Sequence, residues 1–243
     1  RGEDHMTNSA AQIQLFEALG SSPPRLGHLS LLTDISGEGL SKRLGSLSLK
    51  DLRQEGFQPM AISSLLSKVG TSDAIDIFKN INQIIDDFDI NKFGKSKPKF
   101  DKMELLNLNS KFFQLINFDD ISDQLNTFDF EITTEFWNLI KGNINTFNDI
   151  KFWWDIVYGK IKTINDDHEF THLALKTLPN DSFDKNTWST WTSLLMKESG
   201  RKGKDLFKPL RLCLTGQNNG PEMANLVLTM GRQKIVERLN NKN

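Results

Sequence analysis

The 243-residue chain is long enough to bury a hydrophobic core and to form one large domain or two to three small ones. Thirty Lys and Arg against 31 Asp and Glu give a formal net charge of −1. This excludes a strong overall basic excess of the kind that marks many nucleic-acid binders, so an argument for such binding must rest on local charge. The single cysteine, Cys213, excludes an intrachain disulfide and a cysteine-rich zinc site, which favours a reducing compartment.

The chain starts with the polar run Arg-Gly-Glu-Asp-His and without a methionine. This run is not a signal peptide, and we expect further sequence upstream because a natural cytoplasmic chain begins with methionine. No apolar run approaches the roughly 20 residues that a membrane-spanning helix needs. The sequence therefore predicts a soluble, cytoplasmic protein with no membrane partner.

Residues 1–56 have mixed character. A helical pattern covers residues 10–19 and is followed by a Ser-Ser-Pro-Pro break. The short apolar run 28–33 leads into a turn-rich segment, which is typical of a buried strand that enters a glycine loop. Residues 48–55 predict a short helix with a serine N-cap. The segment thus predicts a partial α/β piece.

From Pro59 onward the apolar residues recur at helical spacing, and no alternating strand pattern follows. Gly231 is expected to end the last of these predicted helices. The five tryptophans and 17 phenylalanines, against one tyrosine, are read as core material. The fold class is therefore mainly α: a partial α/β piece followed by an all-helical region. The predicted helices cover 59–68, 101–116, 147–158, 184–199, 206–214 and 221–230.

Positive charge gathers in two blocks, which could contact a phosphate backbone by releasing counterions. For any single residue, a solvated surface lysine is the simpler interpretation. The first block surrounds a Pro-containing linker and holds Lys92, Lys95, Lys97, Lys99 and Lys102. The second holds Lys197, Arg201, Lys202, Lys204, Lys208 and Arg211.

His168-Glu-Phe-Thr-His172 matches the H-E-x-x-H pattern of zinc metalloproteases, in which both histidines lie on one helix face. Here the run Asn165-Asp-Asp precedes the first histidine and is typical of a helix N-cap at the surface. A third ligand would have to come from a distant carboxylate. We therefore favour a solvated helix start and predict no metal site.

Two glycine-containing segments invite comparison with phosphate loops. Gly200-Arg-Lys-Gly-Lys204 lacks the Walker spacing and is interpreted as a helix stop with a basic turn, which is also suited to contact with a nucleic-acid backbone. Gly37-Glu-Gly-Leu-Ser-Lys-Arg-Leu-Gly45 is the stronger signal, because its glycines let the backbone bend and Lys42 with Arg43 could neutralise a triphosphate. Taken alone, the second segment could equally be a surface turn.

A family resemblance favours the phosphate-binding interpretation. Gly39-Leu-Ser-Lys-Arg43 resembles the K-[ML]-S-K-[RS] signature of class I aminoacyl-tRNA synthetases, and the following Leu44-Gly-Ser-Leu-Ser-Leu is similar to the bacterial glutamyl-tRNA synthetase form. Further similar segments run through the chain in the family's order. They are Arg1-Gly-Glu-Asp-His5, Gln12 to Gly20, Phe100-Asp101 with Leu108, Asn109 and Lys111, Gly200 to Arg211, Leu214 to Gly216, and Gly220 to Glu222. The chain thus resembles the C-terminal half of that family.

The resemblance implies roles in glutamyl-adenylate formation from L-glutamate and ATP with Mg2+. Arg1 matches the arginine that binds the substrate carboxylate, for which a guanidinium fork is suited. Asp4 and His5 match positions lining the adenosine side. Ser41 and Lys42 match catalytic residues of the signature loop, where Lys42 neutralises charge growing on pyrophosphate, and Arg43 is a further ATP-binding residue.

The chain departs from the family pattern in two ways. Gly39 replaces the first signature lysine, so one cationic contact to ATP is lost unless Arg43 compensates. The family's H-I-G-H-type motif precedes the position of Arg1 and has no equivalent among these residues. We therefore expect this polypeptide alone not to form glutamyl-adenylate. A non-catalytic tRNA-binding module, or a degenerate paralogue, remains the alternative.

The helical half resembles the anticodon-binding region. Arg211, Gly220, Pro221 and Met223 match positions that contact anticodon bases of tRNA(Glu), although core packing is the simpler role for Met223. In the family, a residue near Lys141–Thr146 discriminates glutamate from glutamine tRNAs. No arginine stands in this segment, which leaves tRNA(Gln) open as a second substrate.

The resemblance also implies a domain layout, and we expect the protein to be a monomer. Residues 1–56 would be a remnant of the catalytic nucleotide-binding domain that carries the ATP loop. Residues 57–100 would be a helical region that contacts the tRNA stem. Residues 101–243 would bind the anticodon and could divide near residue 180.

Overall fold

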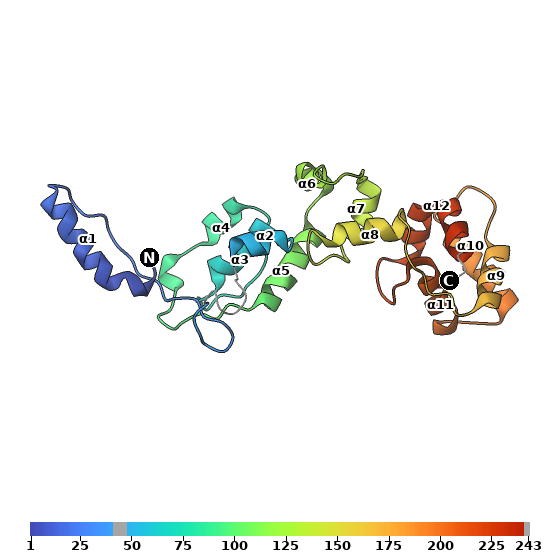
Figure 1. Cartoon of the computed structure of the whole chain (residues 1–243), viewed down its shortest axis with the longest axis horizontal. Helices are drawn as coiled ribbons and strands as arrows, with labels where there is room; N and C mark the ends of the chain where they lie inside the picture. The colour runs from blue at the N-terminus through green and yellow to red at the C-terminus, as the bar shows by residue number, and fades with distance from the viewer. Residues whose placement is uncertain (41–47, 241–243) are drawn as a thin grey trace. The chain divides into compact units, whose positions relative to one another are not determined.

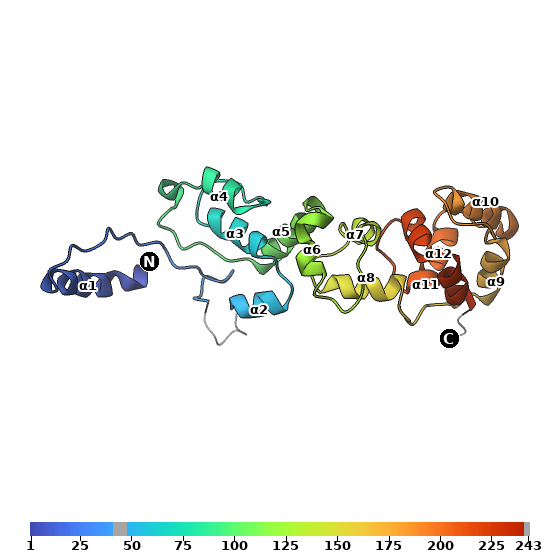
Figure 2. The same cartoon turned by 90° about the horizontal axis from the view of Figure 1, so that it is seen from above.

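The computed structural model describes residues 1–40 and 48–240. The chain divides into two compact units, Arg1–Leu115 and Ile116–Asn243 (Figures 1 and 2). All described regular elements of both units are helices, which confirms the mainly α prediction. Each unit has its own core, so each is described by itself.

The first unit is built around α3 and α5, which pack against each other. Its helical elements are η1 (Glu3–His5), α1 (Met6–Ala18), α2 (Leu49–Gln54), α3 (Pro59–Lys68), α4 (Ile81–Asp87), η3 (Ile90–Lys92) and α5 (Lys102–Leu115). Helix α2 begins as predicted at Ser48, whose hydroxyl accepts from the Asp51 amide at 3.1 Å in a capping box. The core consists of Leu52, Phe57, Ala61, Leu65, Phe100, Leu105 and Leu108.

The prediction of a strand at residues 28–33 is wrong, because the structure describes these residues and forms no strand there. Only isolated bridges occur there: Leu29 pairs with Gly2, and Thr33 pairs with both Gly39 and Lys99. A strand needs a neighbour that continues the hydrogen-bond ladder along its length. Each partner segment meets this stretch at a single position, so extended backbone forms without a sheet.

A buried lysine ties the end of α3 to the following loop. Lys68 is 7% exposed, and its ammonium contacts Asp73 at 2.9 Å and also Asp87. Lys92 reaches the same Asp73 carboxylate at 2.8 Å. Hydrogen bonds from Lys92 and Lys68 lower the pKa of Asp73, while those to Asp87 and Asp73 raise the pKa of Lys68. The charges therefore compensate one another where the loop folds back.

The second unit centres on α12, which packs against α7, α8, α9, α10 and α11. Its elements are α6 (Phe118–Leu125), α7 (Thr134–Ile140), α8 (Asp149–Val157), α9 (His168–Thr177), α10 (Thr187–Ser199), α11 (Lys204–Thr215) and α12 (Met223–Asn240). Trp137 and Trp191 are fully buried, as expected for core aromatic residues, but the prediction that the aromatic residues as a group form core is wrong in part, because Phe16, Phe88, Phe152 and Phe207 are exposed. Gly200 has φ of 68° and caps the end of α10, as the sequence predicted.

Gly231 interrupts α12, with φ of 72° and ψ of 165°. The predicted helix stop is thus confirmed, but a second helical stretch follows and carries Arg238 into the core. Arg238 is 0% exposed and donates to the carbonyls of Ile156 and Gly159, each at 3.0 Å. These carbonyls lie at the C-terminal end of α8, where backbone acceptors lack helical partners and the helix dipole favours a cation.

Candidate functional site

A pocket of about 750 Å³ in the first unit brings together two residues that the sequence singled out, Arg1 and Gly39. The segments 29–33 and 37–40 form most of its lining, and Lys97 completes it. Asp4 and His5 are not among the lining residues, although the Asp4 carboxylate lies against Gly2, where an added Cβ would come within 2.4 Å of it. Ser41, Lys42 and Arg43 lie outside the described residues.

Arg1 is held at the pocket by α1 and by backbone pairing. Its guanidinium donates to the Ser9 hydroxyl at 3.2 Å, and its carbonyl accepts from the Leu29 amide at 2.8 Å. Ser9 is buried and also contacts the carbonyl of His5 and Nε2 of His28. Ser9 therefore joins three segments, a role that its place in a helical pattern did not reveal.

The glycine loop before the signature is shaped by Asp34. Its carboxylate accepts from the Ser36 hydroxyl at 2.6 Å and from the Glu38 amide at 2.9 Å. The Ser36 hydrogen bond is the main reason why the pKa of Asp34 is lowered. Gly37 has φ of 91°, which a residue with a side chain rarely adopts. The turn thus places Gly39 beside Thr33, with which it forms an antiparallel bridge, and both residues line the pocket.

In the second unit, one candidate anticodon residue, Gly220, lies against Trp153 on α8, and two others, Arg211 and Pro221, contact each other. The indole N–H donates to the Asn143 carbonyl at 3.1 Å, within the segment matched to tRNA discrimination. Gly220, with φ of 148°, lies so close that an added Cβ would come within 2.3 Å of the Trp153 ring. Nη2 of Arg211 donates to the Pro221 carbonyl at 3.0 Å. Residues far apart in sequence are therefore packed into one cluster.

The four predicted anticodon residues differ in exposure. Pro221 and Met223 are buried, Met223 being 6% exposed, which agrees with the core-packing role considered for it. Arg211 and Gly220 are partly exposed. The remaining terminal nitrogen of Arg211 is buried without a hydrogen-bond partner among the described residues, and burial lowers the pKa of this side chain. Of the four residues, Arg211 and Gly220 are therefore the ones that remain partly accessible to a ligand.

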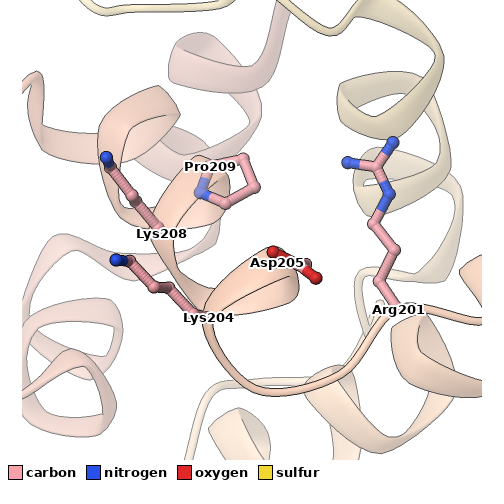
Figure 3. Close-up of a pocket in the computed structure, with 5 residues that line it drawn as sticks. All are labelled: Arg201, Lys204, Asp205, Lys208 and Pro209. Atoms are coloured by element: carbon pink, nitrogen blue, oxygen red, sulfur yellow. The ribbon is translucent and has the colours of Figure 1, made fainter.

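Three cations of the second basic block line a shallow pocket at the start of α11 (Figure 3). Lys204 and Lys208, one helical turn apart, extend from the same side of α11 and are exposed, with Asp205 between them and Arg201. Arg201 is engaged within the unit, since it pairs with Asp167 at 2.6 Å and stacks on Phe170 at 4.6 Å. No ion pair among the described residues engages Lys204 or Lys208, so these two lysines are the cations of this pocket that are available to an anion.

The H-E-x-x-H run starts α9 at the surface. Asp167 accepts from the Phe170 amide at 3.0 Å and so caps the helix, as predicted from the preceding polar run. Both His168 and His172 are exposed. Within residues 1–40 and 48–240, no group of three or more His, Cys, Asp or Glu side chains could hold a metal ion. In the same ranges no helix is long and apolar enough to cross a membrane.

Trp153, Ser9 and Asp34 are the residues that the sequence did not identify. Trp153 stands in a wide apolar stripe with Trp154, where nothing distinguishes a site-forming ring from ordinary core. In the sequence, Lys97 is one of several lysines around a proline, and nothing there distinguishes it from its neighbours. The roles of Trp153, Ser9 and Lys97 depend on contacts between distant segments, which a local pattern cannot report, whereas Asp34 acts through its near neighbours Ser36 and Glu38.

Comparison with known proteins agrees with both units. Residues 1–107 match the family "tRNA synthetases class I (E and Q), catalytic domain", and residues 104–242 match "Anticodon binding domain". A glutamate–tRNA ligase of Maricaulis maris is 41% identical over 240 residues, covering 98% of this chain and 54% of that protein. One from Azospirillum brasilense is 42% identical over 241 residues with the same coverage. The chain therefore spans about half the length of these relatives.

Solved structures share the fold. A glutamate tRNA ligase from Elizabethkingia meningosepticum, crystallised in complex with its amino acid, has a TM-score of 0.76 at 22% identity. The match covers 99% of this chain and 55% of that one. A glutamate-tRNA synthetase from Elizabethkingia anophelis gives 0.75 at 23% identity, again over 99% and 55%. The chain belongs to the glutamyl-tRNA synthetase family of class I aminoacyl-tRNA synthetases.

Proposed function

We propose that the complete gene product is a glutamate–tRNA ligase, which uses ATP to attach L-glutamate to tRNA(Glu) through glutamyl-adenylate. The relatives that match nearly the whole chain carry this name, and the matched families cover both units. The observation that carries the proposal is the pocket shared by Arg1 and the glycine loop, because it joins the two segments with the most specific motifs.

In the first unit, the pocket would take part in the chemistry of adenylate formation. Arg1 is suited to the carboxylate of glutamate because its guanidinium offers parallel donors, and Ser9 fixes that side chain. Lys42 and Arg43, with Ser41, would bind the phosphates of ATP as the family signature implies, and Asp4 and His5 would lie on the adenosine side. ATP would bind with Mg2+, which neutralises phosphate charge.

In the second unit, the cluster around Trp153 would present the anticodon-reading surface. Arg211 and Gly220 are its partly exposed members, while Pro221 and Met223 would support it from the core. Unpaired bases are commonly read by arginine and by stacking contacts. Lys204 and Lys208 at the neighbouring start of α11 would hold backbone phosphates without reading sequence.

Several finer points belong to the same proposal. The protein would act as a cytoplasmic monomer. Residues 1–56 would form the ATP-loop part of the catalytic domain, residues 57–100 would contact the tRNA stem, and residues 101–243 would bind the anticodon region. Because the segment 141–146 contains no arginine, tRNA(Gln) is a candidate second substrate. The 243-residue chain by itself would bind tRNA without forming the adenylate.

The test is aminoacylation by the complete gene product. Purified protein is incubated with ATP, Mg2+, radiolabelled glutamate and either tRNA(Glu) or tRNA(Gln), and acid-insoluble label is measured. We expect label on tRNA(Glu), lost without ATP. Arg211→Ala should lower kcat/KM for tRNA while leaving KM for ATP unchanged, and Arg232→Ala is the matched control. Tight tRNA binding without any transfer of glutamate would favour the non-catalytic module instead.

A further inference from the structure

Lys97 lines the same pocket as Arg1 and Gly39, although it lies more than fifty residues beyond the glycine loop. Among the residues that the structure describes, Arg1 and Lys97 are the only cationic residues in this lining, and Glu38 is its only carboxylate. The neighbouring Lys95 and Lys99 are exposed but do not line the pocket. Among the lysines of this segment, Lys97 is therefore the one placed at the pocket.

Backbone bonds through Thr33 hold Lys97 in this position. The amide of Thr33 donates to the Pro98 carbonyl at 2.9 Å, and its own carbonyl accepts from the Phe100 amide at 2.8 Å. The same Thr33 bridges to Gly39 on its other side. Thr33 is 4% exposed, so this junction is firm. The backbone on both sides of one buried residue thus presents Gly39 and Lys97 to a common space.

The Lys97 ammonium is available for a ligand. No ion pair joins it to a carboxylate anywhere in the described parts of the chain, and its side chain is exposed. By contrast, Lys68, Lys92 and Lys102 of the same unit are each paired with an aspartate or glutamate. A lysine ammonium is a mobile point charge on a long stem, which suits phosphate oxygens.

We propose that Lys97 binds the polyphosphate of ATP and supplies the cation that Gly39 does not provide. This inference rests on the proposed function, because it assigns ATP to the pocket. Lys97 is then a nucleotide-binding residue contributed by the segment that follows η3, outside the signature loop. The signature has glycine in place of its first lysine, and Lys97, which folding brings to the same pocket, supplies the positive charge instead.

Steady-state ATP–pyrophosphate exchange by the complete gene product, with glutamate and tRNA(Glu) present, tests the proposal. Lys97→Met should raise KM for ATP about tenfold, the effect of losing one charge-assisted contact. KM for glutamate should stay within about twofold, since Arg1 is untouched. Lys97→Arg, which keeps the charge, should restore KM for ATP to near the wild-type value. Lys95→Met and Lys99→Met are matched controls, being exposed lysines two residues away.

The outcomes separate this inference from the function on which it rests. Wild-type protein without exchange activity would refute the proposed function itself. Normal activity in the wild type and an unchanged KM for ATP in Lys97→Met would overturn the role of Lys97 alone. Equal effects of all three methionine substitutions would also overturn it, because that result indicates a general loss of surface charge. Unchanged far-UV circular dichroism of each variant verifies that the fold is intact.

Discussion

Replacing Gly220 with alanine tests the cluster around Trp153 directly. The new Cβ would come within 2.3 Å of the Trp153 ring and 3.0 Å of a second ring carbon, and φ of 148° is unfavourable for any residue with a side chain. Overpacking costs about 1–3 kcal/mol and a strained backbone a similar amount, so with partial relaxation we expect a loss of about 3 kcal/mol. This loss should lower the melting temperature by roughly 10 °C.

All five tryptophans lie in the second unit, so their fluorescence during urea unfolding reports on that unit alone. Gly142→Ala is the matched control, because its Cβ would meet nothing within 4 Å, and its stability should change by less than about 0.5 kcal/mol. In the double variant Gly220→Ala with Trp153→Leu, the total loss of stability should be smaller than the sum of the losses in the two single variants. Equal stability of Gly220→Ala and wild type would refute the close packing on Trp153.

Three further predictions concern other buried groups. Arg238→Met should destabilise the second unit by about 3–5 kcal/mol, because the carbonyls at the end of α8 lose their hydrogen-bond donor. The control Arg232→Met, at an exposed arginine, should cost under about 1 kcal/mol. Urea unfolding followed by tryptophan fluorescence measures both losses, and equal losses would contradict the role of Arg238 as the cap of α8. The pKa of Asp73 is below its ordinary 3.8, so the ionised carboxylate stabilises the fold above pH 3.8, and this stabilisation is lost as the pH falls through the pKa of Asp73 in the folded protein. Asp73→Asn should therefore speed hydrogen exchange in residues 59–87 at pH 7 but not at a pH below that pKa. Faster exchange of the variant at that low pH as well would argue against the ion pair between Asp73 and Lys68. Burial raises the pKa of Cys213 to about 11, so its thiol should resist alkylation at neutral pH until urea unfolds the protein, and rapid labelling of folded protein would contradict its burial.

Helices and their ends were accessible from sequence because the responsible interactions are local. Ser48 caps α2 through a residue three positions on, and Gly200 ends α10 by adopting a positive φ. The strand prediction for residues 28–33 was wrong because strand formation depends on pairing between distant segments. Its apolar pattern reports burial, whereas a sheet requires a paired neighbour along its length, and within the described residues this stretch forms only isolated bridges, to Gly2, Gly39 and Lys99.

The candidate sites were accessible only in part. Arg1 and Gly39 were identified by their motifs, and the structure brings them to one pocket. The sequence did not identify Trp153 and Lys97 as site residues, because a tryptophan in an apolar stripe is explained by core packing and a lysine beside a proline by a solvated surface. Their contacts with Gly220 and with the glycine-loop pocket arise from chain segments that sequence alone does not align.

We propose that these 243 residues recognise glutamate tRNA through the second unit. The most direct measurement is equilibrium binding of the chain to a tRNA(Glu) transcript and to the same transcript with a changed anticodon, at two salt concentrations. We predict that the anticodon change weakens binding about tenfold or more at both salt concentrations, and that Arg211→Ala removes this difference. Equal binding of both transcripts by the wild-type chain would contradict the account.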